Sequence, residues 1–162
     1  MPLITVDGFQ DDAFAPLADD MPLPNGAVLV SLARFQKERD ALIARNAPIG
    51  VRLKSDQPPE LLGEDVERLS LVALEFPKFR DGRAFSWARQ LRTRLGFKGQ
   101  VRAVGDFLYD QIAHQHRVGF DAWEVAEGFT PDTLHRALNE IANVYQPSAD
   151  GRKTIRQLRA SA

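Results

Sequence analysis

The stretch LSLVALEFPKFRDGRAFSWARQLRTRL, residues 69–95, passes from a buried strand straight into a helix. Its first eight residues are mostly apolar at neighbouring positions, which is typical of strands covered on both faces. Apolar residues then recur at helical spacing, and Gly96 ends the helix; they are Ala84, Ala88, Leu91 and Leu95. We expect Gly82 to give the turn between the two elements its conformational freedom.

The same alternation of strand and helix continues on both sides of this stretch. Other runs of strand length are AVLVSL (27–32), PIGVRL (48–53), QVRAVGD (100–106) and FDAWEV (120–125). Helices are predicted at 34–46, 84–95 and 107–118, with a short turn of helix at 59–69. The last helix is predicted to begin at the N-cap Thr130 and to end at Pro147, with one apolar face: Leu134, Leu138, Ile141 and Tyr145.

Five strands that alternate with helices indicate an α/β fold with a parallel sheet. The repeat fits an open flavodoxin-like sheet and half of a (β/α) barrel equally well, and both fold types bind ligands at the carboxyl ends of the strands. We interpret residues 1–162 as a single domain, in which 1–26 form a short strand pair or arm and 149–162 a loose polar tail.

The composition excludes several classes of site. The chain has no cysteine, so disulfides, a thiolate nucleophile and cysteine-held zinc or iron–sulfur clusters are ruled out within it. The apolar runs are too short to span a bilayer, and no secretory signal opens the chain, so we expect a cytoplasmic protein that does not insert into membranes. No GxGxxG, GxxxxGK[ST] or GxSxG motif is present, and no cofactor can be named from the residues.

Charge is distributed unevenly although the formal net charge is only −1. Residues 1–26 contain five aspartates and neither Lys nor Arg, whereas residues 78–102 contain eight basic residues and one acid, Asp81. Such a segment indicates either an anionic partner or one solvated helix face. Nucleic acid is not expected as a partner, because the basic segment is short and the whole chain is not basic.

The candidate anion site lies where residues 69–76 lead into the next helix. Basic residues gather around this turn, and the positive end of the helix dipole also favours an anion there; the predicted site comprises Lys78, Arg80, Gly82, Arg83 and Arg89. Asp106, at the end of the next strand, is the candidate general base. The alternative for Asp81 and Asp106 is that they cap the helices that follow them or pair with Arg80 and Arg83.

Other residues are interpreted as structural. Arg102 lies within a strand and needs a partner, for which Asp121 or Glu124 is available. His114 and His116 are two positions apart in a helix and therefore face different ways, which argues against a metal site. Trp87 and Trp123 are expected to pack in the core, and Asp110 and Gln111 to lie on a helix surface.

Several longer strings resemble a bacterial family of uncharacterised proteins, often labelled probable oxidoreductases involved in sulfite reduction. They are PLADDMPLPNGAVLVSLARF (16–35), FPKFRDGRAFSWAR (76–89), VRAVGD (101–106), DQ (110–111), GFDAWE (119–124) and VYQPSADGR (144–152). The resemblance covers most of the chain. It implies a role in sulfate assimilation and, as partners, sulfite reductase or sulfonucleotide reductase, but it brings no catalytic residues with it.

Three hypotheses follow. The first is an accessory protein of sulfate and sulfite reduction that uses the basic turn to bind an oxyanion or an acidic partner surface. The second is a small enzyme, an oxidoreductase or a lyase or isomerase, with Arg80 and Arg83 holding the substrate and Asp106 as base; a flavin could bind at the strand ends without a signature motif. The third is a structural homodimer in which two half barrels pair along their sheet edges.

Overall fold

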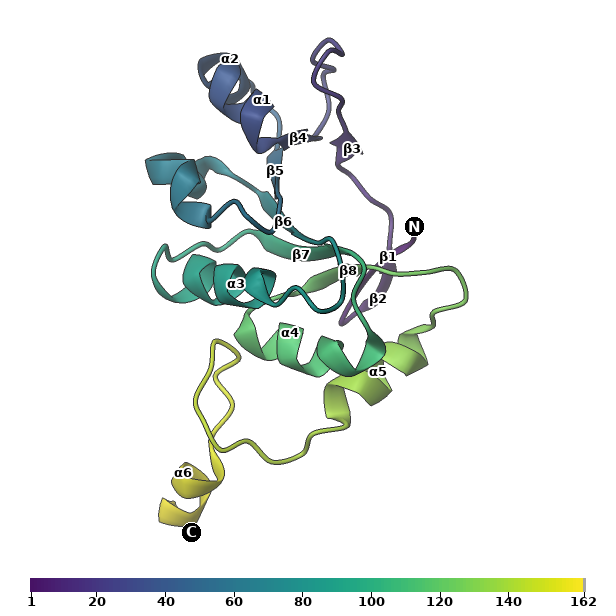
Figure 1. Ribbon diagram of the computed structural model, residues 1–162, viewed down its shortest axis with the longest axis vertical. Helices are drawn as coiled ribbons and strands as arrows, with labels where there is room; N and C mark the ends of the chain where they lie inside the picture. The colour runs from purple at the N-terminus through teal and green to yellow at the C-terminus, as the bar shows by residue number, and fades with distance from the viewer. Residues whose placement is uncertain (162) are drawn as a thin grey trace.

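A single curled sheet organises the computed structural model, which describes residues 1–161 (Figure 1). Its eight strands stand in the order β2-β1-β8-β7-β6-β5-β4-β3. Strands β3 to β8 run parallel to one another, while β1 pairs antiparallel with both β2 and β8. Their bounds are β1 Leu3–Thr5, β2 Gly8–Gln10, β3 Ala15–Pro16, β4 Val28–Ser31, β5 Ile49–Leu53, β6 Leu71–Phe76, β7 Gln100–Gly105 and β8 Ala122–Glu124.

The strand order decides between the two α/β architectures. From β4 to β8 each strand lies beside its predecessor in the chain, so the order never reverses as it does in a flavodoxin-like sheet. The fold is therefore the half-barrel type. The predicted α/β class and the five predicted parallel strands are confirmed, and three shorter strands from the first 16 residues extend the sheet at both edges.

The helices follow the predicted order but not all of the predicted bounds. The α-helices are α1 Leu32–Lys37, α2 Arg39–Ile43, α3 Arg83–Thr93, α4 Ile112–Val118, α5 Pro131–Asn139 and α6 Ile155–Ala160. Two 3₁₀ segments, η1 Pro59–Arg68 and η2 Tyr109–Gln111, complete the set. The helix predicted at 34–46 is broken at Glu38 into α1 and α2, and the helix predicted at 107–118 begins only after Leu108.

Helix α5 is shorter than predicted. It begins as expected at the N-cap Thr130, but it ends at Asn139 instead of running to Pro147. The predicted apolar face fails because its second half has nothing to pack against: Leu134 is buried, whereas Tyr145 is 79% exposed. The tail expected to be loose contains α6, which projects from the body of the molecule (Figure 1), and residue 162 lies outside the described residues.

The two faces of the sheet are covered differently. The main core lies between the sheet and the helices, and it includes Val72, Leu74 and Trp123. A smaller cluster on the opposite, inner face consists of Leu29, Leu71, Ala73 and Val104, with Phe14 packed against it. Both faces of the central strands are therefore buried, as their continuous apolar sequence predicts.

Residues 11–26 form a segment that we call the N-terminal strap. It leaves β2 at one edge of the sheet and reaches β3, beside β4, at the other edge, along the side of the sheet away from α3 (Figure 1). Arg34 is almost fully buried and donates hydrogen bonds to the carbonyl oxygens of Ala18 and Met21, and Arg45 donates to those of Pro24 and Gly26. These bonds fix the outer end of the strap to helix α1 and to the turn after helix α2.

None of the helices in the described part of the chain is both long and apolar enough to cross a lipid bilayer.

Candidate functional site

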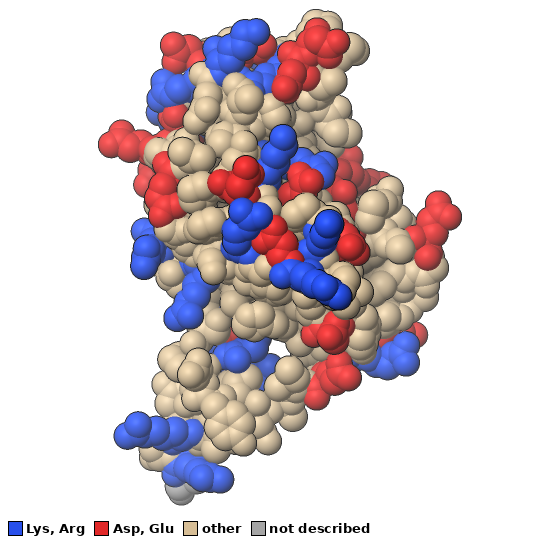
Figure 2. Space-filling view, viewed as in Figure 1, with Lys and Arg blue, Asp and Glu red and all other residues tan. Residues whose placement is uncertain are grey.

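The turn between β6 and α3, residues 77–83, carries the basic residues singled out in the sequence; we call it the basic turn. The side chains of Lys78 and Arg80 are exposed, and within residues 1–161 neither makes a hydrogen bond or an ion pair. Arg80 lies over the ring of Phe79, 5.4 Å from its centroid. On the face shown in Figure 2, acidic groups are interleaved with the Lys and Arg side chains over the middle of the molecule, so the basic residues on this face do not form one continuous patch.

Arg83 is held by the protein itself. Its guanidinium donates to both carboxylate oxygens of Asp81, at 3.0 and 2.7 Å, and to the hydroxyl of Ser55 at 2.9 Å. Asp81 also accepts a hydrogen bond from the backbone N–H of Arg83. The hydrogen bonds from Arg83 hold the pKa of the Asp81 carboxyl well below its usual range. The alternative interpretation, in which an arginine of the turn pairs with an aspartate, therefore applies to Arg83, whose charge is largely neutralised by Asp81.

Gly82 does not need the conformational freedom of glycine, contrary to the prediction. Its φ of −87° and ψ of 1° are accessible to any residue. A Cβ atom at this position would meet only the ring of Phe85 at 3.8 Å, an ordinary contact. Gly82 thus serves as the N-cap residue of α3 without being required there.

Hydrogen bonds tie the basic turn to the two neighbouring loops. Arg83 of the turn donates to the Ser55 hydroxyl, and the indole N–H of Trp87 on helix α3 adds a bond to the Ser55 carbonyl at 2.9 Å. On the other side, the amide of Gln111 donates to the carbonyl of Phe79 at 2.8 Å. The loops after β5, β6 and β7 are therefore cross-linked. Gln111, expected to be a plain surface residue, positions the backbone of the turn that carries Lys78 and Arg80.

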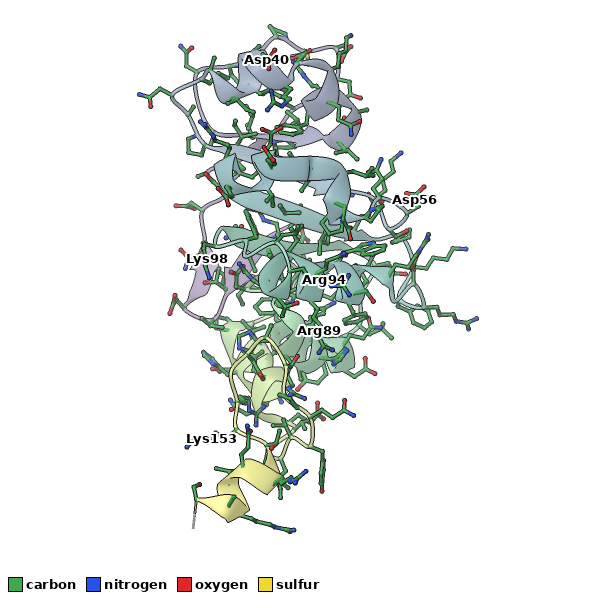
Figure 3. The ribbon with its side chains drawn as sticks, turned by 90° about the vertical axis from the view of Figure 1, so that its left-hand side faces the viewer. Asp40, Asp56, Arg89, Arg94, Lys98 and Lys153 are labelled. Carbon is green, nitrogen blue, oxygen red and sulfur yellow. The ribbon has the colours of Figure 1, made fainter. Side chains whose placement is uncertain are left out.

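Arg89 lies on helix α3, apart from the tip of the basic turn. With Arg94 it lines an open groove of about 480 Å³ along this helix. Figure 3 shows both arginines between the edge marked by Asp56 and the opposite edge marked by Lys98. Lys78 and Arg80 thus share the basic turn, whereas Arg89 lies along helix α3.

Asp106 lies at the carboxyl edge beside the end of β6. Its backbone N–H donates to the carbonyl of Phe76 at 2.7 Å, which sets it one strand from the start of the basic turn. Its carboxylate is exposed and makes no hydrogen bond with any described residue, so it neither caps a helix nor joins a buried ion pair. The capping interpretation is wrong because the next helix begins only after Leu108.

Charged residues on the inner face of the sheet were missed as a group. Arg102, 1% exposed, donates to both carboxylate oxygens of Asp12 in the strap, at 2.6 and 2.9 Å, and to Glu124 at 3.3 Å. Arg52 donates to Glu75 at 3.1 Å on the neighbouring strands. The available signal was the period of two: in every apolar run except AVLVSL (27–32), a charged residue stands at a position that faces away from the helices.

The partner of Arg102 was predicted in part. Glu124 is one of the two residues proposed, while Asp121 instead pairs with Arg92 at 2.6 Å.

The remaining aromatic and histidine residues were interpreted as structural. Trp123 is fully buried and donates to Gln115. The described residues contain no group of three side chains suited to a metal ion. The ring of His114 packs at a tilt against the ring of Phe85, with the two centroids 5.0 Å apart. Burial lowers the pKa of His114, and the charge of Arg117 adds to this effect.

Comparison with known proteins assigns the sequence of the chain to a family. Residues 50–156 match the sequence profile of a family described as bacterial proteins of unknown function (DUF934). The chain belongs to this family. The matched region runs from β5 to α6, and so it includes the basic turn and Asp106 but not the strap. Neither the curated proteins nor the solved structures contain a significant match.

Proposed function

We propose that this family member is an accessory protein of assimilatory sulfate and sulfite reduction that binds an anionic group at the carboxyl edge of its sheet. The group is either a small oxyanion or an acidic patch on a partner protein. A cytoplasmic location is part of the proposal. The pathway rests on the resemblance of the quoted strings to proteins labelled for sulfite reduction.

The observation that carries the anion-binding proposal is the contrast among three neighbouring cations. Arg83 is neutralised by Asp81, whereas Lys78 and Arg80 are exposed and have no anionic partner among residues 1–161. The backbone that presents them is fixed by the hydrogen bond from Gln111 to Phe79. Because the backbone of the turn is already ordered, anion binding has to restrict only the two side chains and not the loop that carries them.

The test is binding by the purified full-length protein, with sulfite reductase and sulfonucleotide reductase as protein partners and sulfate, sulfite and adenylyl sulfate as ions. The double variant Lys78→Ala/Arg80→Ala should weaken binding about tenfold or more, since two charge-assisted contacts are lost. Arg136→Ala, which removes an arginine from the unrelated helix α5, serves as the matched control.

Salt dependence identifies the kind of ligand. A partner docked through exposed charges should bind more weakly as ionic strength rises. If wild-type protein binds none of the ions and neither reductase, the proposed function is wrong.

The position of Asp106 favours a second candidate, a small enzyme. Its carboxylate is exposed at the same edge as the basic turn and has no partner in the described chain, so it is free to accept a proton from a bound substrate. In this case Asp106→Asn should retain ligand affinity and abolish turnover. Unchanged turnover in a folded Asp106→Asn variant would exclude Asp106 as the base.

A further inference from the structure

A cavity of about 300 Å³ opens on the inner face of the sheet, at the carboxyl ends of β4, β5 and β6. It is lined by Ser31, Arg52, Lys54, Gln57 and Glu75 from the sheet and its loops, and by Asp19 from the strap. The inner face at the carboxyl ends is where (β/α) barrels place their ligands. The volume is at the lower end of the range of roughly 300–1,000 Å³ for small-molecule sites.

The cavity contains hydrogen-bond donors that the protein does not use. Arg52 donates only its Nε–H, to Glu75, so that both terminal nitrogens are without a partner in the described chain; its side chain is 45% exposed. The ammonium group of Lys54 is likewise free within residues 1–161. The carbonyl group of Gln57 accepts from the backbone of Lys54, which leaves its amide N–H groups for a ligand.

The same cavity contains acceptors that are only half used. Asp19 accepts from the Ser31 hydroxyl through one oxygen, at 2.7 Å, and Glu75 accepts from Arg52 through one oxygen, at 3.1 Å. The two carboxylates balance the charges of Arg52 and Lys54. A simple dianion would therefore meet two negative groups, whereas a molecule with one positive and one negative group complements the cavity.

A second hollow adjoins the charged cavity and shares Ser31 and Arg52 with it. Its remaining lining comes from Leu29, whose side chain belongs to the inner-face cluster, from the strap residues Pro16 and Ala18, and from Val30 and Leu17, whose side chains pack in the core on the helix side. Burial of a small aliphatic group against the apolar part of this lining is favourable because it removes apolar surface from water. An aliphatic side chain attached to a dipolar head group matches the two hollows together.

We propose that the inner-face cavity binds an α-amino acid with an aliphatic side chain. Its carboxylate faces Arg52, Lys54 and Gln57, and its ammonium group faces Glu75 and Asp19. The site is separate from the basic turn, whose free cations select a net anion. It therefore goes beyond the proposed function and does not depend on it.

Isothermal titration calorimetry with three related probes tests the ligand class. The probes are L-valine, isobutylamine, which lacks the carboxylate, and 3-methylbutanoate, which lacks the ammonium group. L-valine should bind, and each of the other two should bind at least about tenfold more weakly, because each leaves one pair of protein charges without a counter-charge. Absence of L-valine binding at about 10 mM, or equal binding of all three probes, would overturn the proposal.

Variants locate the site. Arg52→Gln and Glu75→Gln should each raise the dissociation constant for L-valine about tenfold or more, while Arg80→Ala on the basic turn should leave it unchanged. Circular dichroism checks the fold, and Lys54→Gln, a change to an exposed side chain, replaces any variant that fails this check. Loss of binding in Arg80→Ala but not in Arg52→Gln or Lys54→Gln would assign the ligand to the basic turn and refute the inner-face site.

Discussion

Gly105, in the string VRAVGD, is a position where only glycine fits. Its φ is +97°, and a Cβ atom there would lie 2.4 Å from the carbonyl oxygen of Phe76. We expect Gly105→Ala to lower the free energy of unfolding by about 3 kcal/mol, since backbone strain and a backbone clash combine. Urea denaturation measures the change.

The matched control for this prediction is Gly128→Ala. Gly128 also has a positive φ, +86°, but a Cβ atom would meet no atom within 4 Å. Its replacement should cost only the strain, about 1 kcal/mol. Equal losses in the two variants would show that the contact with Phe76 is not important.

The ion pair between the buried Arg102 and the partly exposed Asp12 predicts a dependence of stability on pH. Burial raises the pKa of Asp12, but hydrogen bonds and the charge of Arg102 lower it by more, so its folded-state pKa lies below its usual value. The unfolded chain then binds more protons in the acid range, so the contribution of Asp12 to stability is fully present above the ordinary pKa of an aspartate and is lost as pH falls through the lowered pKa of the folded state.

The variant Asp12→Asn isolates this contribution. It should destabilise the protein by about 2 kcal/mol at pH 7, because it leaves the charge of Arg102 buried and less well paired, and the difference from wild type should shrink at pH 3. Wild type is measured alongside because Asp121 also contributes to the dependence of stability on pH. Burial raises the pKa of Asp121, and a raised carboxyl pKa increases the stability of the folded state as pH falls, opposite to the effect of Asp12. A difference that is constant between pH 7 and pH 3 would contradict the assignment.

The sequence revealed contacts between neighbours better than contacts between distant residues. The pairing of Arg83 with Asp81 and that of Arg102 with Glu124 were both anticipated, because they lie two positions apart or on adjacent predicted strands. The tighter partner of Arg102 is Asp12, which is 90 positions away in an acidic loop with no regular pattern. Nothing in local sequence connects such a pair.

At the scale of elements, the strap has one aromatic contact with the inner face of the sheet, in addition to its hydrogen bonds. Phe14 packs on the inner-face cluster, whereas Phe9 in β2 is 49% exposed. Phe14→Ala should cost about 2 kcal/mol of unfolding free energy, less than a fully buried Phe because its ring is only partly covered. Phe9→Ala, the matched control, should change it by less than about 0.5 kcal/mol.

Chemical denaturation of both variants, with hydrogen exchange of the inner-face strands, checks this prediction. Faster exchange in β4 and β6 of the Phe14 variant would locate the loss under the strap. Equal effects of the two substitutions would mean that the strap does not stabilise the sheet.

Elements with strong local signals were predicted well, and those defined by packing were not. Helix α3 is found within two residues of its predicted bounds because its apolar face meets the sheet. Strand β3 is two residues long and contains Pro16, so its sequence gives no strand signal. It exists because the strap returns along β4.

At the scale of the whole molecule, the strap argues against closure of two half barrels into one. The inner face already carries Phe14, and the β3 edge is short and contains Pro16, which cannot donate a ladder hydrogen bond. We therefore expect sedimentation velocity at micromolar concentration to show a monomer. A stable dimer would support the homodimer hypothesis and would require another interface or displacement of the strap.

The repeat of strand and helix predicted the half barrel as one of two options, since both produce the same sequence pattern. What separates them is the order in which strands assemble, and that order depends on which sheet face each crossover helix covers. Here the helical core lies on one face, and the strap with its charged contacts lies on the other.

The strap and β1 also bear on how the chain emerges from the ribosome. Strand β1 pairs with β8, so residues 3–5 must wait for residues 122–124 before they join the sheet. At about 5–20 residues per second that wait lasts roughly ten seconds, during which an apolar segment would be prone to aggregate. The five aspartates among residues 1–26, with no Lys or Arg beside them, give the waiting segment a uniform negative charge. Like charges disfavour the association of two such segments, so the same acidic composition that provides Asp12 for Arg102 also opposes aggregation of this part of the chain before it joins the sheet.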